Sequence, residues 1–464
     1  MASAPFDLAD LQGDILRAYG NTYACTTYLF FRVDDAGAGR AWLRRLLPRV
    51  TTAEPWTAGK PEATLNIAVT AAGVKALGVP EPVIATFSKE FRAGMAARAP
   101  TLGDAGPSDP DRWEPELRDG ALHVLATVNA LDVGALQREL GRLRDDAEHA
   151  GGVAVAYEQP TVLLPSPDER GSREHFGYAD GFAQPAIAGV EDATDRRIGG
   201  GVPEAKGAWR ALAPGEFILG YEDEDTRVDP NRKLPHAPAD PFGRSGTYMV
   251  WRKLYQDVAL FRHVLREAAG LYGGGDHEKL AAKVVGRWPN GTPLVVSPDA
   301  PIADFEPRTD PRTNAFRYAD EDPHGLRCPL GAHIRRSNPR DALGFDGLLS
   351  FRHRIIRRGM PYGPPLASEA TQDDHVDRGL VFVCFNASIS RQFEGIQAQW
   401  LNDGNVFHLG HDSDFLMGDP HGTGKMTVEG HPPFLLGPQG PFVTTRGGAY
   451  LFVPGMGALA ALAG

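Results

Sequence analysis

The order of predicted strands and helices indicates an α+β protein built from two related halves. Between residues 25 and 157, segments with strand-like and helix-like periodicity follow one another as strand, helix, strand, long loop, strand, helix and strand. A similar order returns between residues 247 and 453. This order predicts that each half is a ferredoxin-like unit, an antiparallel sheet with packed helices. No short sequence repeat supports the duplication, so it rests on element order.

In the first half, four short segments rich in β-branched and aromatic residues predict strands. These segments are residues 25–33, 64–69, 122–128 and 152–157. One helix is predicted at residues 40–50 and another after Asp132. The second helix has the clearer pattern, because Asp132 is a good N-cap residue and Leu136 and Leu140 lie on one face.

The second half shows the same alternation. Strands are predicted at residues 247–252, 379–385 and 449–453. A helix from Val258 to Leu265 has apolar residues at helical spacing, and so does a helix from Ile389 to Trp400. Both therefore present an apolar face that can pack on a sheet.

Two long segments without clear periodicity lie between these elements, at residues 166–220 and 301–326. Loops of this length are usually functional or disordered. The sequence therefore predicts an N-terminal domain of residues 1–165 and a C-terminal domain of residues 166–464. We expect the chemistry in or beside the two long segments.

The composition disfavours several classes of partner. The 464 residues include 48 Lys and Arg against 59 Asp and Glu, a net charge of −11. Nucleic acids and anionic membranes both reward clustered positive charge, so neither is an expected partner. No apolar run approaches the roughly 20 residues that span a bilayer, and the opening residues do not resemble a secretory signal. Three scattered cysteines fit neither a disulfide framework nor a zinc ribbon. A cytoplasmic location is therefore expected.

Asp180 is the first candidate catalytic residue. It lies in the segment Gly177-Tyr-Ala-Asp-Gly181, where two glycines bracket one acid among aromatic residues. A carboxylate on a tight glycine turn beside aromatic surface suits a general acid or base. The alternative is a turn in which Asp180 hydrogen-bonds its own backbone, since Asp-Gly turns are common.

His333 is a candidate iron ligand. It lies in a short apolar stretch and is followed by Arg335, Arg336 and Arg340. A haem needs an axial ligand for its iron and cationic partners for its propionates, and this segment offers both. The same arginines would suit a phosphate or carboxylate ligand, and a lone histidine is often structural, so the segment alone leaves the ligand open.

Two further segments carry chemically useful side chains. The run from Arg354 to Arg358 sets arginines beside isoleucines, which is also compatible with an exposed strand. The pair His408 and His411 has acids nearby and is a candidate for a divalent metal. A glycine between the two histidines argues against the helix that would align them.

Together these segments resemble the dye-decolorizing peroxidase family over nearly the whole chain. The matching segments, in the family's order, are the opening at residues 7–16, the GxxDG signature at 177–181, the proximal-histidine segment at 328–341, the distal-arginine strand at 355–363, and later segments at 378–384, 392–400 and 439–452. Tyr178 stands where the family more often has Phe. One such motif is weak evidence, but their agreement in order outweighs the separate structural alternatives.

The resemblance implies two ferredoxin-like halves and one haem b per chain, held mostly in the C-terminal half. It implies that His333 is the axial ligand of the iron. Arg335 and Asn338 are expected to contact the haem edge. One of Asp412 and Asp414 is expected to orient His333 through its second ring nitrogen.

The resemblance also implies the reaction. Asp180 is the expected distal acid and Arg357 the expected distal arginine, with Arg354 and Arg358 as alternatives to Arg357. The expected enzyme reduces hydrogen peroxide and oxidises bulky aromatic donors, such as dyes and phenols, through an oxoferryl state. Its partners are therefore hydrogen peroxide and aromatic reductants, and a homo-oligomer is left open.

Two other functions remain as alternatives at this point. A haem-binding or iron-releasing protein on the same scaffold would have no chemical need for the pair of Asp180 and Arg357. A metal-dependent hydrolase using His408 and His411 would bind no haem.

Overall fold

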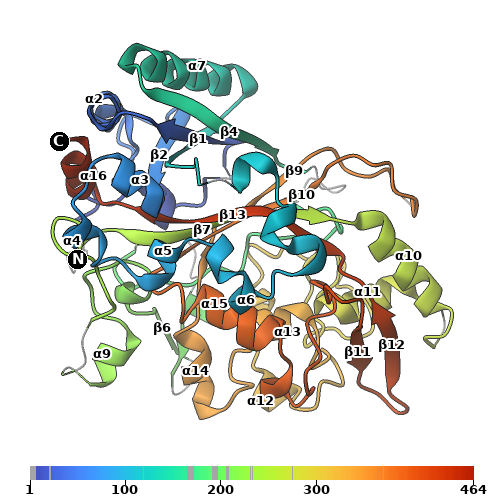
Figure 1. Cartoon of the computed structure of the whole chain (residues 1–464). Helices are drawn as coiled ribbons and strands as arrows, with labels where there is room; N and C mark the ends of the chain where they lie inside the picture. The colour runs from blue at the N-terminus through green and yellow to red at the C-terminus, as the bar shows by residue number, and fades with distance from the viewer. Residues whose placement is uncertain are drawn as a thin grey trace.

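The computed structural model shows one antiparallel sheet running through the molecule, with helices and long connections packed against it (Figure 1). The structure describes residues 7–19, 22–118, 120–164, 172–190, 197–204, 208–229, 231, 234–273, 275–368 and 370–464. In this part of the chain, nine strands join in the order β4-β1-β3-β2-β13-β7-β10-β8, with β9 paired to β10. The predicted α+β class is confirmed.

The first half contributes four strands in the order β4-β1-β3-β2, and all neighbours are antiparallel. The strands are β1 (Cys25–Val33), β2 (Ala63–Val69), β3 (Val124–Ala130) and β4 (Val153–Val162). Helix α2 (Ala36–Leu46) follows β1, and helix α7 (Val133–Ala150) connects β3 to β4. Figure 1 shows both helices at the top of the molecule, beside these strands. This is the ferredoxin-like order that the sequence predicts.

Helix α7 begins where the sequence predicts, because Asp132 caps it. The backbone N–H of Ala135 donates to the Asp132 carboxylate, 2.8 Å away. Leu136, Leu140 and Leu143 are buried in the core cluster that also contains side chains of α2 and of the sheet. The apolar face thus holds the helix against the strands.

The second half repeats the same strand order, as β13-β7-β10 followed by β8 and β9. Its strands are β7 (Thr247–Gln256), β8 (Ile356–Arg357), β9 (Met360–Tyr362), β10 (Gly379–Asn386) and β13 (Val443–Val453). Helices α10 (Val258–Ala269) and α11 (His277–Val285) follow β7. The two halves meet where Phe452 of β13 pairs with Val69 of β2. Two ferredoxin-like halves therefore share one sheet.

Short elements fill the connections. The helices are α1 (Gly13–Leu16), α3 (Ala71–Ala76), α4 (Glu81–Ile84), α5 (Lys89–Ala93), α6 (Ala99–Leu102), α9 (Glu224–Val228), α12 (Tyr318–Glu321), α13 (His333–Ser337), α14 (Leu348–Phe351) and α16 (Met456–Ala463). Two small hairpins are formed by β5 (Val202–Pro203) with β6 (Trp209–Arg210) and by β11 (Gly424–Val428) with β12 (Phe434–Gln439). Figure 1 shows α13, α14 and α15 (Phe393–Gly395) below the sheet.

The helix predicted from Ile389 to Trp400 is shorter and more irregular than expected. It begins as α15 (Phe393–Gly395) and continues as a π-helical turn from Ile396 to Leu401. Gln392 precedes it in a non-helical conformation, and its side-chain amide donates to the backbone of Arg354, 2.7 Å away. That long-range contact decides where the helix starts, and periodicity could not predict it.

The predicted boundary between residues 165 and 166 falls within residues 165–171, which lie outside the described residues. The division into two domains therefore stays a prediction. Among the residues that the structure describes, no helix has the length and apolar character needed to cross a bilayer.

Candidate active site

A cavity of about 300 Å³ lies in the second half, between its sheet and the segment around His333. Strands β7 and β10 contribute Leu254 and Phe382 to its wall, and Asp180 and Arg357 border it as well. Many of the other lining residues are apolar and include Val285, Phe316, Ile334, Ile355, Phe393, Ile396, Trp400 and Leu416. A mostly apolar cavity with a few convergent polar groups is typical of a cofactor or substrate site.

His333 is the first residue of helix α13 and is held by a buried acid. Its Nδ1 atom lies 3.1 and 3.2 Å from the two carboxylate oxygens of Asp414. Burial by itself lowers the pKa of His333, but the Asp414 carboxylate outweighs burial and raises it. Asp412 does not take this role, since its carboxylate lies 3.5 Å from Lys425. With Nδ1 engaged by Asp414, Nε2 is the ring nitrogen left for a metal.

The loop that presents Asp180 is stabilised by another acid. Gly177 and Gly181 have φ angles of 102° and 85°, a backbone conformation that favours glycine. The Glu174 carboxylate accepts backbone N–H groups of this loop, among them that of Tyr178 at 2.9 Å. Because Glu174 holds the turn, the Asp180 carboxylate is available at the cavity.

Asp180 and Arg357 form an ion pair at the cavity. The distance between Asp180 Oδ1 and Arg357 Nη1 is 3.0 Å, and the Asp180 side chain is 41% exposed beside the cavity. Burial raises the pKa of Asp180, but the Arg357 guanidinium and the N–H of Gly181 outweigh burial and lower it below 3.8. Asp180 is therefore ionised at neutral and mildly acidic pH, as a proton acceptor must be.

Arg357 is the arginine of its run that reaches Asp180. The Gln184 side chain holds the backbone of Arg357, accepting its N–H at 3.0 Å and donating to its carbonyl at 3.1 Å. The neighbouring Arg358 instead donates to the backbone oxygen of Asp14, 2.9 Å away. The guanidinium groups of Arg357 and Arg358 therefore have different partners, Asp180 at the cavity and the backbone of helix α1.

Three more arginines at the cavity, Arg287, Arg340 and Arg354, donate to backbone oxygens. Among the described residues, none of them forms an ion pair with a carboxylate. Burial lowers the pKa of Arg287 and of Arg354 to about 9. Buried cations without carboxylate partners are costly, so this part of the cavity suits an anionic ligand. A haem fits these features, because its propionates match the arginines, its ring matches the apolar wall and His333 matches its iron.

Comparison with known proteins gives the family. A family model described as "DyP dimeric alpha+beta barrel domain" matches residues 10–157. The dye-decolorizing peroxidase of Mycena epipterygia is 30% identical over 98% of this chain and 87% of its own length. Multifunctional dye peroxidase DyP2 of Amycolatopsis sp. (strain ATCC 39116 / 75iv2) is 31% identical over 98% of this chain and 96% of its own length. The chain belongs to the dye-decolorizing peroxidase family.

Solved structures of dye-decolorizing peroxidases have the same fold. An ancestral D-type dye decolorizing peroxidase is 30% identical, with a TM-score of 0.80 over 98% of this chain and 99% of that chain. AauDyP in complex with imidazole is 25% identical, with a TM-score of 0.82 over 99% of this chain and 100% of that chain. The resemblance predicted from the motifs is therefore confirmed along the whole chain.

The two residues predicted to contact the haem edge, Arg335 and Asn338, lie in different surroundings. Arg335 does not line the cavity, because its guanidinium donates to the Asp322 carboxylate at 3.2 Å and to the Cys328 carbonyl at 2.8 Å. The side chain is buried among these partners, away from the cavity lining. Asn338 does line the cavity, and its contact with haem stays a prediction.

The structure does not arrange His408 and His411 as a metal site. The side chain of His411 is 94% exposed, and His408 sits at a positive φ of 63° just after a short 3₁₀ turn. The described part of the chain contains no group of three or more His, Cys, Asp or Glu side chains arranged to hold a metal ion. The structure therefore gives the hydrolase alternative no support.

Sequence reasoning missed Arg287 and Gln184 as residues of this site. Arg287 follows α11 in a Gly-Arg-Trp stretch that carries no recognisable signal. Gln184 lies four residues after Asp180 and close to the GxxDG signature. This closeness in sequence could have indicated that Gln184 belongs to the site. The sequence does single out Arg340 among the arginines that could pair with an anion, and it names Arg354 only as an alternative to Arg357.

Proposed function

We propose that this protein is a haem peroxidase that reduces hydrogen peroxide and oxidises bulky aromatic donors such as dyes and phenols. The observation that carries the proposal is the ion pair of Asp180 and Arg357 on the cavity that His333 also lines. An ionised carboxylate beside a guanidinium suits proton transfer and charge stabilisation during cleavage of a peroxide bond. The names of the relatives, which are dye peroxidases, support the same class of donor.

The proposed haem would be held from two directions. His333, oriented by Asp414, would bind the iron, and Arg287, Arg340 and Arg354 would pair with the propionates. When bound, the haem supplies a redox-active iron at which the oxygen–oxygen bond of the peroxide breaks. One haem b per chain is the stoichiometry that this single His333 site supports.

Asp180 performs the proton transfer in this proposal. Its carboxylate takes the proton from one oxygen of hydrogen peroxide and gives it to the other oxygen, which leaves as water. Because Arg357 keeps the pKa of Asp180 low, the carboxylate is ready to accept this proton at acidic pH. The Arg357 guanidinium stabilises the negative charge that develops while the bond breaks, and it orients the peroxide.

A haem-binding or iron-releasing protein is the second candidate. The name Deferrochelatase belongs to a relative from Yersinia pestis that is 31% identical over 77 residues, which are 17% of this chain and 15% of the relative. That match is much shorter than the matches to the dye peroxidases. Moreover, haem storage or iron release gives no role to the low pKa of Asp180.

The spectrum of the purified protein, followed by a peroxide assay, tests the proposal. We expect a Soret band and an oxidation of an aromatic dye that depends on added hydrogen peroxide. The absence of any haem spectrum after reconstitution would overturn the proposal. Bound haem without peroxide-dependent oxidation would favour the haem-binding or iron-releasing alternative.

Replacing Arg357 should slow the reaction with peroxide. In Arg357→Leu we expect a rate constant lower by roughly 10²–10³, the usual cost of losing one donor that stabilises transition-state charge. Stopped-flow absorbance at the Soret band measures this rate. Arg352→Leu is the matched control, because Arg352 lies in the same segment but pairs with Asp225 and does not line the cavity. An equal loss in both variants would show that Arg357 has no special role.

A further inference from the structure

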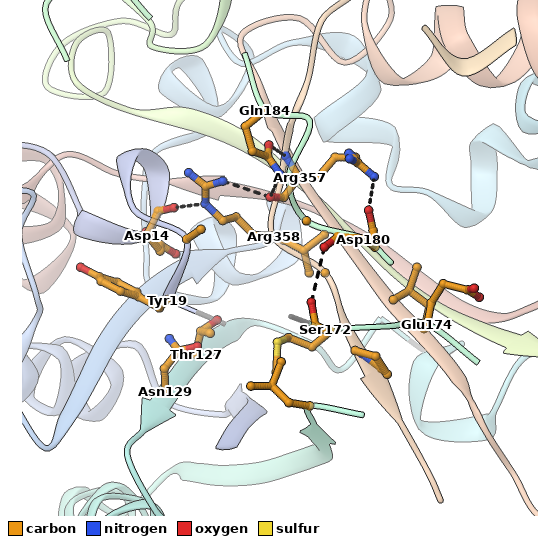
Figure 2. A pocket seen from close by; sticks show the side chains of 18 of the residues that line it. Asp14, Tyr19, Thr127, Asn129, Ser172, Glu174, Asp180, Gln184, Arg357 and Arg358 are labelled. Carbon is orange, nitrogen blue, oxygen red and sulfur yellow. Dashed lines mark hydrogen bonds and ion pairs between the residues drawn. The ribbon is translucent and has the colours of Figure 1, made fainter. Parts of the chain in front are cut away.

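A second cavity lies on the other side of the catalytic pair. Its volume is about 60 Å³, which leaves room for a few water molecules. Asp180, Arg357 and Glu174 border both this cavity and the larger one. Figure 2 shows Asp14 and Tyr19 on one side of the second cavity and Asp180 with Ser172 on the other. The second cavity therefore connects the catalytic carboxylate to the first helix of the chain.

Asp14 is a buried carboxyl group in the wall of this second cavity. It lies in helix α1, and the residue is 6% exposed. Its Oδ1 atom and the hydroxyl of Tyr19 are buried and have no hydrogen-bond partner among the described residues. Buried polar atoms normally have a partner, and atoms that face a small polar cavity usually find it in water. Asp14 is therefore a buried carboxyl group in the cavity wall, with one oxygen that has no partner among the described residues.

The surroundings of Asp14 favour its protonated form. Burial raises its pKa to about 7, and the nearby Arg358 guanidinium lowers it by less. The other ionisable or charged groups on the cavity wall are Arg17, Tyr19, Tyr28, Arg173, Glu174, Asp180 and Arg357. The Glu174 oxygens already accept two backbone N–H groups and the side-chain amide of Gln256. Burial raises the pKa of Glu174 as well, but donors occupy both of its oxygens, whereas Oδ1 of Asp14 has no partner among the described residues. Asp14 is therefore the acid on this wall best placed to exchange a proton.

The proposed peroxidase reaction requires such an exchange. Reduction of hydrogen peroxide to two waters consumes two electrons and two protons in addition to the two protons that peroxide carries. Asp180 only moves a proton from one peroxide oxygen to the other, so it supplies none of the additional two. Bulky donors that stay outside the active site can deliver electrons to it through the protein. Protons do not cross such distances without a chain of groups that carry them. The additional protons therefore need their own route to the active site.

We propose that the second cavity is a water-filled proton path and that Asp14 passes protons from it to Asp180. Asp14 then acts through Asp180: it hands protons to the Asp180 carboxylate and does not contact the peroxide. This inference rests on the proposed peroxidase function and adds the source of the protons that the function consumes. Tyr19 orders the same water through its hydroxyl. Asp14 recovers its proton from solvent after each transfer.

The test is the substitution Asp14→Asn, which keeps the shape of the side chain and removes the exchangeable proton. Ferrocyanide is the donor of choice, because it supplies electrons and no proton. We expect turnover at pH 6 to fall about tenfold, since a relay outside the chemical step contributes less than a direct acid or base. Wild-type turnover should decline as the pH rises through about 7, where Asp14 loses its proton. That decline should be absent in the variant.

The rate of the first reaction with peroxide should change less than about twofold in Asp14→Asn, because that step needs no added proton. This measurement also shows whether the variant is folded and holds haem. Tyr19→Phe, which removes one hydroxyl, should slow turnover by a smaller factor. Glu216→Gln is the matched control, because Glu216 is also buried with a pKa near 7 but borders neither cavity. It should keep the wild-type pH profile of turnover.

Two outcomes would overturn the proton path. Unchanged turnover and an unchanged pH profile in Asp14→Asn would show that protons arrive elsewhere. An equal loss of turnover in Glu216→Gln would show that the effect reflects general stability. In either case a normal first reaction with peroxide would leave the proposed function intact, whereas a protein without haem or peroxide reactivity would contradict that function itself.

Discussion

Asp180→Asn is expected to bind haem normally and to react with hydrogen peroxide more slowly by roughly 10²–10⁴, the contribution of a positioned acid or base. Asparagine keeps the size of the side chain and its hydrogen bonding to the loop but cannot accept the proton. The loop itself should persist, because the Glu174 carboxylate holds the backbone N–H of Tyr178 and its neighbour. Stopped-flow absorbance gives the rate, and the melting temperature should stay within a few degrees of wild type.

The pH profile makes this prediction specific to the carboxylate. Arg357 holds the pKa of Asp180 below 3.8, so the wild-type peroxide reaction should persist at mildly acidic pH. It should decline only as the pH falls through that lowered value, where Asp180 becomes protonated. The Asp180→Asn variant should lack this decline. Normal haem binding with unchanged kinetics and pH profile would show that the GxxDG match marks only a structural turn.

His333→Ala is expected to lose haem or to bind it weakly with an altered Soret band. Alanine removes the ring nitrogen proposed as the iron ligand and leaves the Asp414 carboxylate buried without its partner. An unpaired buried carboxylate is costly, so a lower melting temperature should accompany the loss of haem. Haem titration followed by absorbance measures both the affinity and the spectrum.

His353→Ala is the matched control for this experiment. His353 lines the same cavity and packs on Trp400, with ring centroids 4.7 Å apart. Its Nδ1 atom contacts the backbone oxygen of Leu349 and no carboxylate. The control should therefore keep a spectrum of iron bound to histidine. If His333→Ala kept that spectrum and His353→Ala lost it, the assignment of the iron ligand would be wrong.

Much of the fold could be predicted because it rests on local patterns. The β-branched and aromatic residues at 25–33 and the cap at Asp132 predicted β1 and α7 closely, since both signals act within one short segment of the chain. The start of α15 was not predictable in this way. The start of this helix depends on Gln392, whose side-chain amide donates to the backbone oxygen of Arg354. The two residues are 38 positions apart in the sequence. The boundary between domains stays a prediction, because it lies outside the described residues.

The candidate site could be predicted only as separate segments. The sequence singled out Asp180, His333 and Arg357 through motifs, but 177 positions separate the two members of the ion pair. It also predicted Arg335 as a haem contact, whereas Asp322 and a backbone carbonyl hold that guanidinium away from the cavity. Neighbouring arginines in one motif look alike in sequence and differ in which face of their element they occupy.

The sequence by itself thus determined the fold class and the family, and it singled out Asp180, His333 and Arg357 as candidate site residues, because motifs depend on residue type and spacing. Only the tertiary structure decided which arginine pairs with Asp180, that Asp414 holds His333, and that Arg287 belongs to the cavity. These facts depend on the directions of side chains from distant segments. Periodicity predicts the face of a helix or strand on which a side chain lies. Which residue that side chain contacts is decided by how the elements pack together.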